Sequence, residues 1–192
     1  MTESTSVSIL LVDDEPDVLK TFERWLEDEY EVFTAIDGNE ALEILESNGI
    51  DIVLLDRRMP GLSGDEVLER ITTLDLDCQV AMVTAVEPGL DIVEMGFDEY
   101  VVKPPTYDEF HDTIENLLER RDHSETRQEF WSLLSKRNTL EHEIDSAQLD
   151  DSEEYNTLLQ RIEDLKDELA AAEDRMGEDT AFVSAMREIE GR

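Results

Sequence analysis

The chain has 192 residues, enough for one domain of about 120 residues and a smaller second unit. It carries 51 Asp and Glu against 16 Lys and Arg, which gives a formal net charge of −35. A surface this acidic repels phosphate backbones, which argues against direct binding to DNA or RNA. Because 40% of the residues are apolar, we expect a folded protein adapted to high salt, where ions screen the self-repulsion.

The chain has no sequence feature of a secreted or membrane-bound protein. Cys78 is its only cysteine, so no intrachain disulfide can form. Residues 1–6 lack the basic flank and apolar core of a signal peptide, and no apolar run approaches the length of a membrane span. We therefore expect a cytoplasmic protein without membrane contact.

Residues 7–122 read as five repeats of a strand followed by a helix. Strands are predicted at 9–12, 30–35, 52–55, 80–84 and 100–102, and helices at 16–28, 39–47, 64–73, within 88–95 and at 106–122. Short β-rich runs that alternate with helical periods are typical of a parallel sheet. The fold class that we expect is α/β, with a doubly wound parallel sheet.

From residue 124 onward the chain loses proline and shows no strand-like run. Two helices are predicted, 125–147 and 152–176, with a turn at 149–151, Ser152 as the N-cap of the second, and a further short helix at 180–190. Apolar residues recur along both long helices at steps of three and four, as in a heptad pattern. This stripe is compatible with an intrachain helical hairpin or with an intermolecular coiled coil.

Polar residues follow four of the five predicted strands. Asp13 and Asp14 follow the first, Asp56 the third, Thr84 ends the fourth, and Lys103 follows the fifth. Since the carboxyl ends of parallel strands share one edge of a sheet, these side chains should converge. Each has an ordinary explanation by itself, such as a helix N-cap, a solvated acid or a Lys-Pro turn, but their joint placement indicates a site.

Three carboxylates, a hydroxyl and an ammonium suit the transfer of a phosphoryl group to aspartate. We expect Asp56 to be the acceptor that forms an acyl phosphate. Asp13 and Asp14 would hold a hard divalent cation, normally Mg²⁺, directly or through water. Lys103 and Thr84 would each bind a phosphoryl oxygen.

Residues 7–122 resemble the receiver domain of two-component response regulators. The matching motifs are Asp13-Asp14, Asp56 with Met59-Pro60, Gly64, Thr84-Ala85 and the run Tyr100-Val101-Val102-Lys103-Pro104. The resemblance implies strand order 2-1-3-4-5 and a sensor histidine kinase as phosphoryl donor. It also implies that the backbone carbonyl of Arg58 completes the Mg²⁺ site and that Thr84 and Tyr100 move on phosphorylation. It further implies a cis peptide bond at Lys103-Pro104.

Two features depart from the receiver pattern. The segment between Thr84 and Lys103 is a few residues shorter than usual, so the fourth helix should be short or distorted, which changes the usual output surface. Arg57 and Arg58 place two cations beside the acceptor. They either tune the lifetime of the acyl phosphate or form salt links with nearby acids.

Residues 124–192 resemble the HalX domain of haloarchaeal receivers by position, length and acidic helical character. We therefore divide the chain into a receiver domain at 1–123 and a HalX-like domain at 124–192. The leading hypothesis is a signalling switch and not an enzyme, with only slow autodephosphorylation and an output through the tail, as a homodimer or with a partner regulator. The alternatives are an aspartyl-phosphate hydrolase, disfavoured because Asp13-Asp14-Glu15 lacks the Asp-x-Asp pattern, and a DNA-binding factor, disfavoured by the acidic tail.

Overall fold

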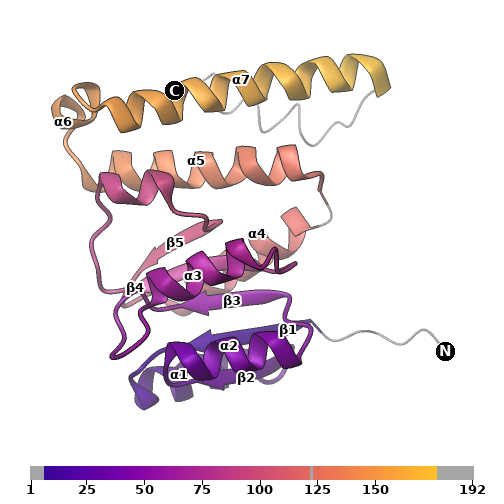
Figure 1. The fold of residues 1–192 in the computed structure, drawn as a ribbon, viewed down its shortest axis with the longest axis vertical. Coiled ribbons are helices and arrows are strands. Elements are labelled where there is room, and N and C mark those ends of the chain that lie inside the picture. The colour runs from indigo at the N-terminus through magenta and orange to yellow at the C-terminus, as the bar shows by residue number, and fades with distance from the viewer. Residues whose placement is uncertain (1–6, 122, 177–192) are drawn as a thin grey trace.

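The computed structural model describes residues 7–121 and 123–176. Its centre is a parallel sheet of β1 (Ser8–Val12), β2 (Glu31–Ala35), β3 (Ile52–Leu55), β4 (Gln79–Thr84) and β5 (Glu99–Val102). The spatial order is β2-β1-β3-β4-β5, and each neighbouring pair is parallel. The predicted doubly wound α/β fold with strand order 2-1-3-4-5 is confirmed (Figure 1).

Helices cover both faces of this sheet, as its uninterrupted apolar strands require. One face packs against α1 (Pro16–Leu26) and α4 (Tyr107–Arg121) through side chains such as Leu11 and Phe110. The other packs against α2 (Gly38–Ser47) and α3 (Gly64–Thr73) through side chains such as Leu10 and Val67. Successive residues of one strand thus belong to two separate hydrophobic clusters, because side chains alternate across the sheet.

The connection between β4 and β5 contains only a short 3-10 helix, η1 (Leu90–Glu94). This confirms the short fourth helix that the sequence predicts. The last helix of the receiver is therefore α4 in the numbering of Figure 1.

The tail forms α5 (Glu125–Glu143), α6 (Ser146–Asp150) and α7 (Glu153–Met176). The prediction of one helix over 125–147 is wrong, because Ile144 has extended backbone angles (φ −117°, ψ 138°) and separates α5 from α6. A β-branched residue followed by Asp145 is a weak helical sequence, which is consistent with a break there. The predicted cap of α7 is confirmed, since Ser152 Oγ accepts a hydrogen bond from Tyr155 N at 3.0 Å. The predicted helix at 180–190 lies outside the described residues.

The helices α5 and α7 pack against each other in opposite directions within the chain (Figure 1). Tyr155, Leu158, Ile162, Leu165 and Leu169 of the predicted stripe on α7 are all buried. On α5 the stripe is only partly right, because Leu134, Ser135 and Lys136 are buried as well. The hairpin alternative therefore describes this chain, and α5 is buried on more than the side that faces α7.

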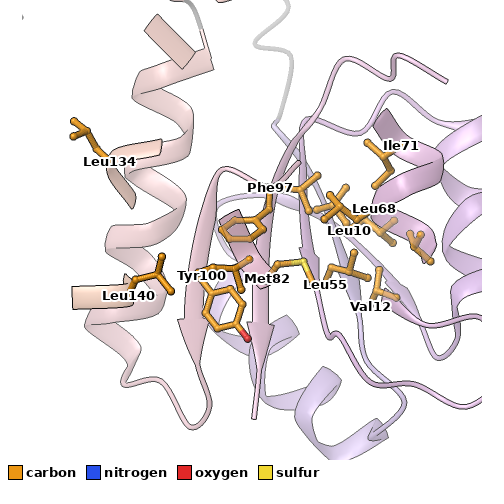
Figure 2. Close-up of a cluster of buried hydrophobic side chains, with 14 of the residues drawn as sticks. Leu10, Val12, Leu55, Leu68, Ile71, Met82, Phe97, Tyr100, Leu134 and Leu140 are labelled. Atoms are coloured by element: carbon orange, nitrogen blue, oxygen red, sulfur yellow. The ribbon is translucent and has the colours of Figure 1, made fainter. Parts of the chain in front are cut away.

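The additional buried side of α5 faces the receiver. Helix α5 contacts β5, η1 and α4, and it runs beside the edge strand of the sheet (Figure 1). Phe130, Leu134 and Leu140 of α5 belong to the same hydrophobic cluster as Phe97 and Tyr100 of the receiver. Figure 2 shows Phe97 and Tyr100 between this helix and Met82 of the sheet. The tail thus takes part in the receiver's core.

Among residues 7–121 and 123–176, none of the helices combines the length and the apolar character that a membrane span requires.

Candidate phosphoacceptor site

The predicted site residues converge at the carboxyl end of the sheet. Asp13 follows β1 and is only 3% exposed, and Asp56 follows β3 and is only 8% exposed. Carboxylate oxygens of Asp13, the half-buried Asp14 and Asp56 all lie within 4.8 Å of one another. Such close carboxylates repel one another strongly unless a cation lies among them.

Lys103 supplies a cation to this cluster. Its Nζ forms ion pairs with Asp13 Oδ2 and, at 3.6 Å, with Asp56 Oδ2. The backbone N–H of Lys103 donates to the Thr84 carbonyl at 2.9 Å, which fixes the loop after β5 against the end of β4. The Lys103–Pro104 peptide bond is cis, as the receiver resemblance implies.

One oxygen of Asp56 is unused. Among the described residues, Asp56 Oδ1 is buried and has no hydrogen-bond partner. An unpaired buried carboxylate oxygen is costly, which indicates that a further ligand belongs here. A divalent cation with oxygen ligands fits this arrangement, since three carboxylates surround the position and Lys103 compensates only one charge.

The loop after Asp56 passes very close to α3. A Cβ on Gly64 would lie 2.0 Å from the Asp56 carbonyl oxygen, and Gly64 N donates to the Arg57 carbonyl at 2.9 Å. Only glycine allows this approach, which explains why the sequence motif includes it. Arg58 follows in the same loop with an exposed side chain, and the role of its carbonyl as a metal ligand stays a prediction.

Thr84 and Tyr100 meet at one backbone segment. Thr84 is 1% exposed, and its Oγ1 accepts a hydrogen bond from Val86 N at 3.3 Å. The Tyr100 hydroxyl donates to the Val86 carbonyl at 2.7 Å. Burial raises the pKa of Tyr100, although Arg57 opposes this. The two predicted switch residues therefore both bind the backbone of Val86.

Arg57 forms salt links with nearby acids, which was one of the two interpretations of the pair Arg57 and Arg58. Its Nε and Nη2 donate to Asp65 at 2.9 and 3.0 Å, and Nη2 also donates to Asp91 of η1 at 2.7 Å. The hydrogen bond to Asp65 is the main reason why the pKa of Arg57 is raised. Sequence patterns do not indicate Asp91 as its partner, because that contact depends on where η1 lies.

Comparison with known proteins shows the family to which this chain belongs. A sequence model of the response regulator receiver domain matches residues 9–115, and one of the HalX domain matches residues 119–186. The chain belongs to the response regulator receiver family, with a HalX domain behind the receiver. A candidate transcriptional regulator of Haloferax volcanii is 44% identical over 85% of this chain, which spans 28% of that protein.

Receivers from other organisms match the first unit alone. The transcriptional regulatory protein PrrA of Mycobacterium tuberculosis is 38% identical over 64% of this chain and 54% of its own length. The chain thus spans about half or less of these relatives. The response regulator TrrA of Thermotoga maritima, solved with Mg²⁺ and beryllofluoride, is 36% identical, with a TM-score of 0.52 over 58% of this chain and 98% of its own.

A CheY-like receiver of Methanospirillum hungatei is 28% identical, with a TM-score of 0.58 over 62% of this chain and 98% of its own.

Proposed function

We propose that this protein is the response regulator of a two-component phosphorelay. Asp56 accepts a phosphoryl group from the phosphohistidine of a sensor histidine kinase, and the HalX domain passes the signal on. One observation carries this proposal: carboxylate oxygens of Asp13, Asp14 and Asp56 lie within 4.8 Å of one another beside the Lys103 ammonium, and Asp56 Oδ1 is buried without a partner among the described residues.

In the transfer, a carboxylate oxygen of Asp56 attacks phosphorus while the P–N bond to the donor histidine breaks. The product is an acyl phosphate, and the histidine leaves as imidazole after it takes up a proton. The Lys103 ammonium, which already contacts Asp56 Oδ2, binds a phosphoryl oxygen. Asp13, Asp14, Asp56 and the Arg58 carbonyl would hold Mg²⁺, which neutralises negative charge on the phosphoryl group.

The signal leaves the site through Thr84 and Tyr100. Thr84 Oγ1 moves toward the phosphoryl group, and its present bond from Val86 N is long enough (3.3 Å) to give way. Val86 carries the change to Tyr100 through the hydroxyl bond to its carbonyl. Tyr100 lies in the hydrophobic cluster that includes α5, so a change at Tyr100 alters the packing beside the HalX domain.

We keep the division into 1–123 and 124–192, a cytoplasmic location and a halophilic environment as parts of this proposal. The relatives are named as transcriptional regulators, and we infer that this chain acts on its target through protein contacts. The net charge of −35 disfavours direct DNA binding. The absence of an Asp-x-Asp motif around Asp13 disfavours the hydrolase alternative.

The test is the intact mass of the purified protein in concentrated KCl with Mg²⁺ and acetyl phosphate. We expect a gain of one phosphoryl group, its loss on removal of Mg²⁺ with EDTA, and its loss in Asp56→Asn. A matched control is Asp37→Asn. Asp37 caps α2 through its side chain, and Asn is an equally good N-cap. An Asp56→Asn protein that is labelled like the wild type would disprove the assignment.

A further inference from the structure

The 3-10 helix η1 is attached at both ends, once to the phosphoacceptor loop and once to the tail. Near its start, Asp91 Oδ2 accepts a hydrogen bond from Arg57 Nη2 at 2.7 Å. Near its end, the carbonyls of Met95 and Val93 accept from Lys136 Nζ of α5 at 2.5 and 3.5 Å. Arg57 directly follows Asp56 in the chain. A short path of charged contacts therefore runs from the acceptor through η1 to α5.

The Lys136 contact is buried and specific. Lys136 is 5% exposed, and its Nζ also lies 5.1 Å from the centre of the Phe97 ring. The Phe97 ring is 5.6 Å from the Tyr100 ring, centre to centre (Figure 2). A buried ammonium is tolerated only where carbonyls or a ring face compensate for lost water. Its position thus depends on η1 and Phe97 staying where they are.

Arg57 directly follows the acceptor Asp56, so its side-chain contacts belong to the acceptor loop. The guanidinium is 9% exposed and is shared between Asp65 of α3 and Asp91 of η1. An acyl phosphate on the neighbouring Asp56 carries close to two negative charges where the free carboxylate carries one. Of the two carboxylates that hold the guanidinium, Asp91 contributes one hydrogen bond against two from Asp65, so the Asp91 contact is the smaller of the two.

We propose that η1 connects the phosphoacceptor site to the HalX domain, with Arg57, Asp91 and Lys136 as its positioning residues. Phosphorylation of Asp56 weakens the Arg57–Asp91 contact, η1 shifts, and the Lys136 anchor of α5 loosens. The unphosphorylated state is the one with α5 docked. This inference rests on the proposed function and names the route by which that function reaches the tail.

The test is hydrogen–deuterium exchange of the full chain, with and without Mg²⁺ and beryllofluoride, and with acetyl-phosphate labelling measured in parallel. In the wild type, we expect exchange of the α5 amides to rise roughly tenfold on addition of beryllofluoride, as for loss of one hydrogen bond to a charged group. Asp91→Asn should show this faster exchange without beryllofluoride and no further rise with it. Its labelling should stay within about twofold of the wild type, since Asp91 lies outside the carboxylate cluster.

Two variants separate this route from general weakening of the interface. Glu94→Gln removes one negative charge from an exposed side chain of η1, as Asp91→Asn does. We expect this variant to behave as the wild type. Ser135→Ala removes the bond from α5 to Glu99 of β5 and leaves η1 untouched, so it raises basal exchange but keeps the rise with beryllofluoride. Lys136→Met should abolish that rise, as Asp91→Asn does.

The outcomes are distinct. A full beryllofluoride response in Asp91→Asn, or in Lys136→Met, overturns the route through η1. Labelling of the wild type without any change in α5 overturns it as well but leaves the phosphoacceptor function standing. If the wild type takes up no phosphoryl group, the proposed function fails. Separately, if exchange of the α5 amides in Asp91→Asn without beryllofluoride equals that of the wild type, η1 does not hold α5 and the route is overturned.

Discussion

The two hydrophobic clusters of the receiver are closed by different parts of the chain. The cluster around Leu11 and Phe110 is covered by α1 and α4, which both belong to the receiver. The cluster around Leu10 and Phe97 is covered by α2 and α3 on one side, and it continues beyond β5 into α5 and α7 of the tail. The first cluster is therefore complete within residues 7–121, whereas the second is completed by the HalX domain.

This difference follows from the short η1. A full helix in the β4–β5 connection would cover more of β5 and of the side chains beside it, whereas η1 has only five residues. Helix α5 lies along β5 instead, and Arg120 and Ser135 both bind Glu99 of that strand at 2.6 and 2.5 Å. Covering an edge strand with a helix is a common way to protect it. The tail here is therefore part of the receiver's structure as well as its proposed output.

Removal of the tail gives the largest expected effect. A chain ending at residue 123 would expose Phe97 and Ile92, which are 1% and 0% exposed in the whole protein. Exposing two such side chains costs roughly 3–6 kcal/mol. Urea unfolding followed by circular dichroism in concentrated KCl measures this. A truncated receiver as stable as the full chain would show that the second cluster does not need the tail.

Two phenylalanines test the same contrast within the full chain. Phe97 and Phe110 are each 1% exposed, one in each cluster. Replacement of either by Ala should cost about 3–5 kcal/mol of unfolding free energy. Only Phe97→Ala should also shift the fluorescence of Trp131 on α5, measured in a Trp25→Phe background, because Phe97 packs beside α5. A shift of equal size in Phe110→Ala would mean that the clusters are not separate.

The convergence of the candidate phosphoacceptor residues was predictable from the sequence, since it depends on their order along the chain. Asp13, Asp56, Thr84 and Lys103 each lie at a strand end, and a parallel sheet brings those ends together. The strand order and the cis bond at Lys103–Pro104 came from the family resemblance. Gly64 also came from the family resemblance, and the structure explains it by the close approach of the Asp56 carbonyl.

The docking of the tail could not be predicted in this way. The heptad pattern placed the α7 contacts correctly, because that helix is buried on one side. On α5 it missed Lys136 and Ser135, since these polar residues are buried by partners far away in sequence, the Met95 carbonyl and Glu99. Periodicity reports how apolar residues are spaced, and it contains no information on which distant polar group will compensate a buried ammonium.

A pH titration gives a smaller test at the same interface. Burial raises the pKa of Asp98 from 3.8 to about 6, although the Val80 N–H and the nearby Lys136 and Arg120 oppose the shift and Glu99 adds to it. Between pH 4 and 6 the folded protein keeps a proton that the unfolded chain has lost. The stabilisation from this group is therefore complete below pH 4 and is lost as the pH rises through 6.

Asp98→Asn removes this dependence, since the amide oxygen can still accept from Val80 N. We expect the variant to gain stability relative to the wild type as the pH rises from 4 to 7, which urea midpoints at each pH would measure. A constant difference across this range would mean that Asp98 is ionised throughout.

The smallest effect is expected on the exposed side of the hairpin. Arg161 of α7 binds Glu129 of α5 through two hydrogen bonds, at 2.8 and 2.9 Å, and both side chains are nearly half exposed. Solvent and salt screen such pairs, so Arg161→Gln should lower the urea midpoint slightly at low KCl and not measurably at molar KCl.

Any loss of a cation also increases the self-repulsion of a chain with net charge −35. Lys20→Gln is therefore the matched control, because Lys20 forms one exposed contact to Asp17 within α1. The difference between the two variants isolates the interhelical pair. If Arg161→Gln remains destabilising at molar KCl while Lys20→Gln does not, the α5–α7 contact depends on this ion pair and not on its buried stripe alone.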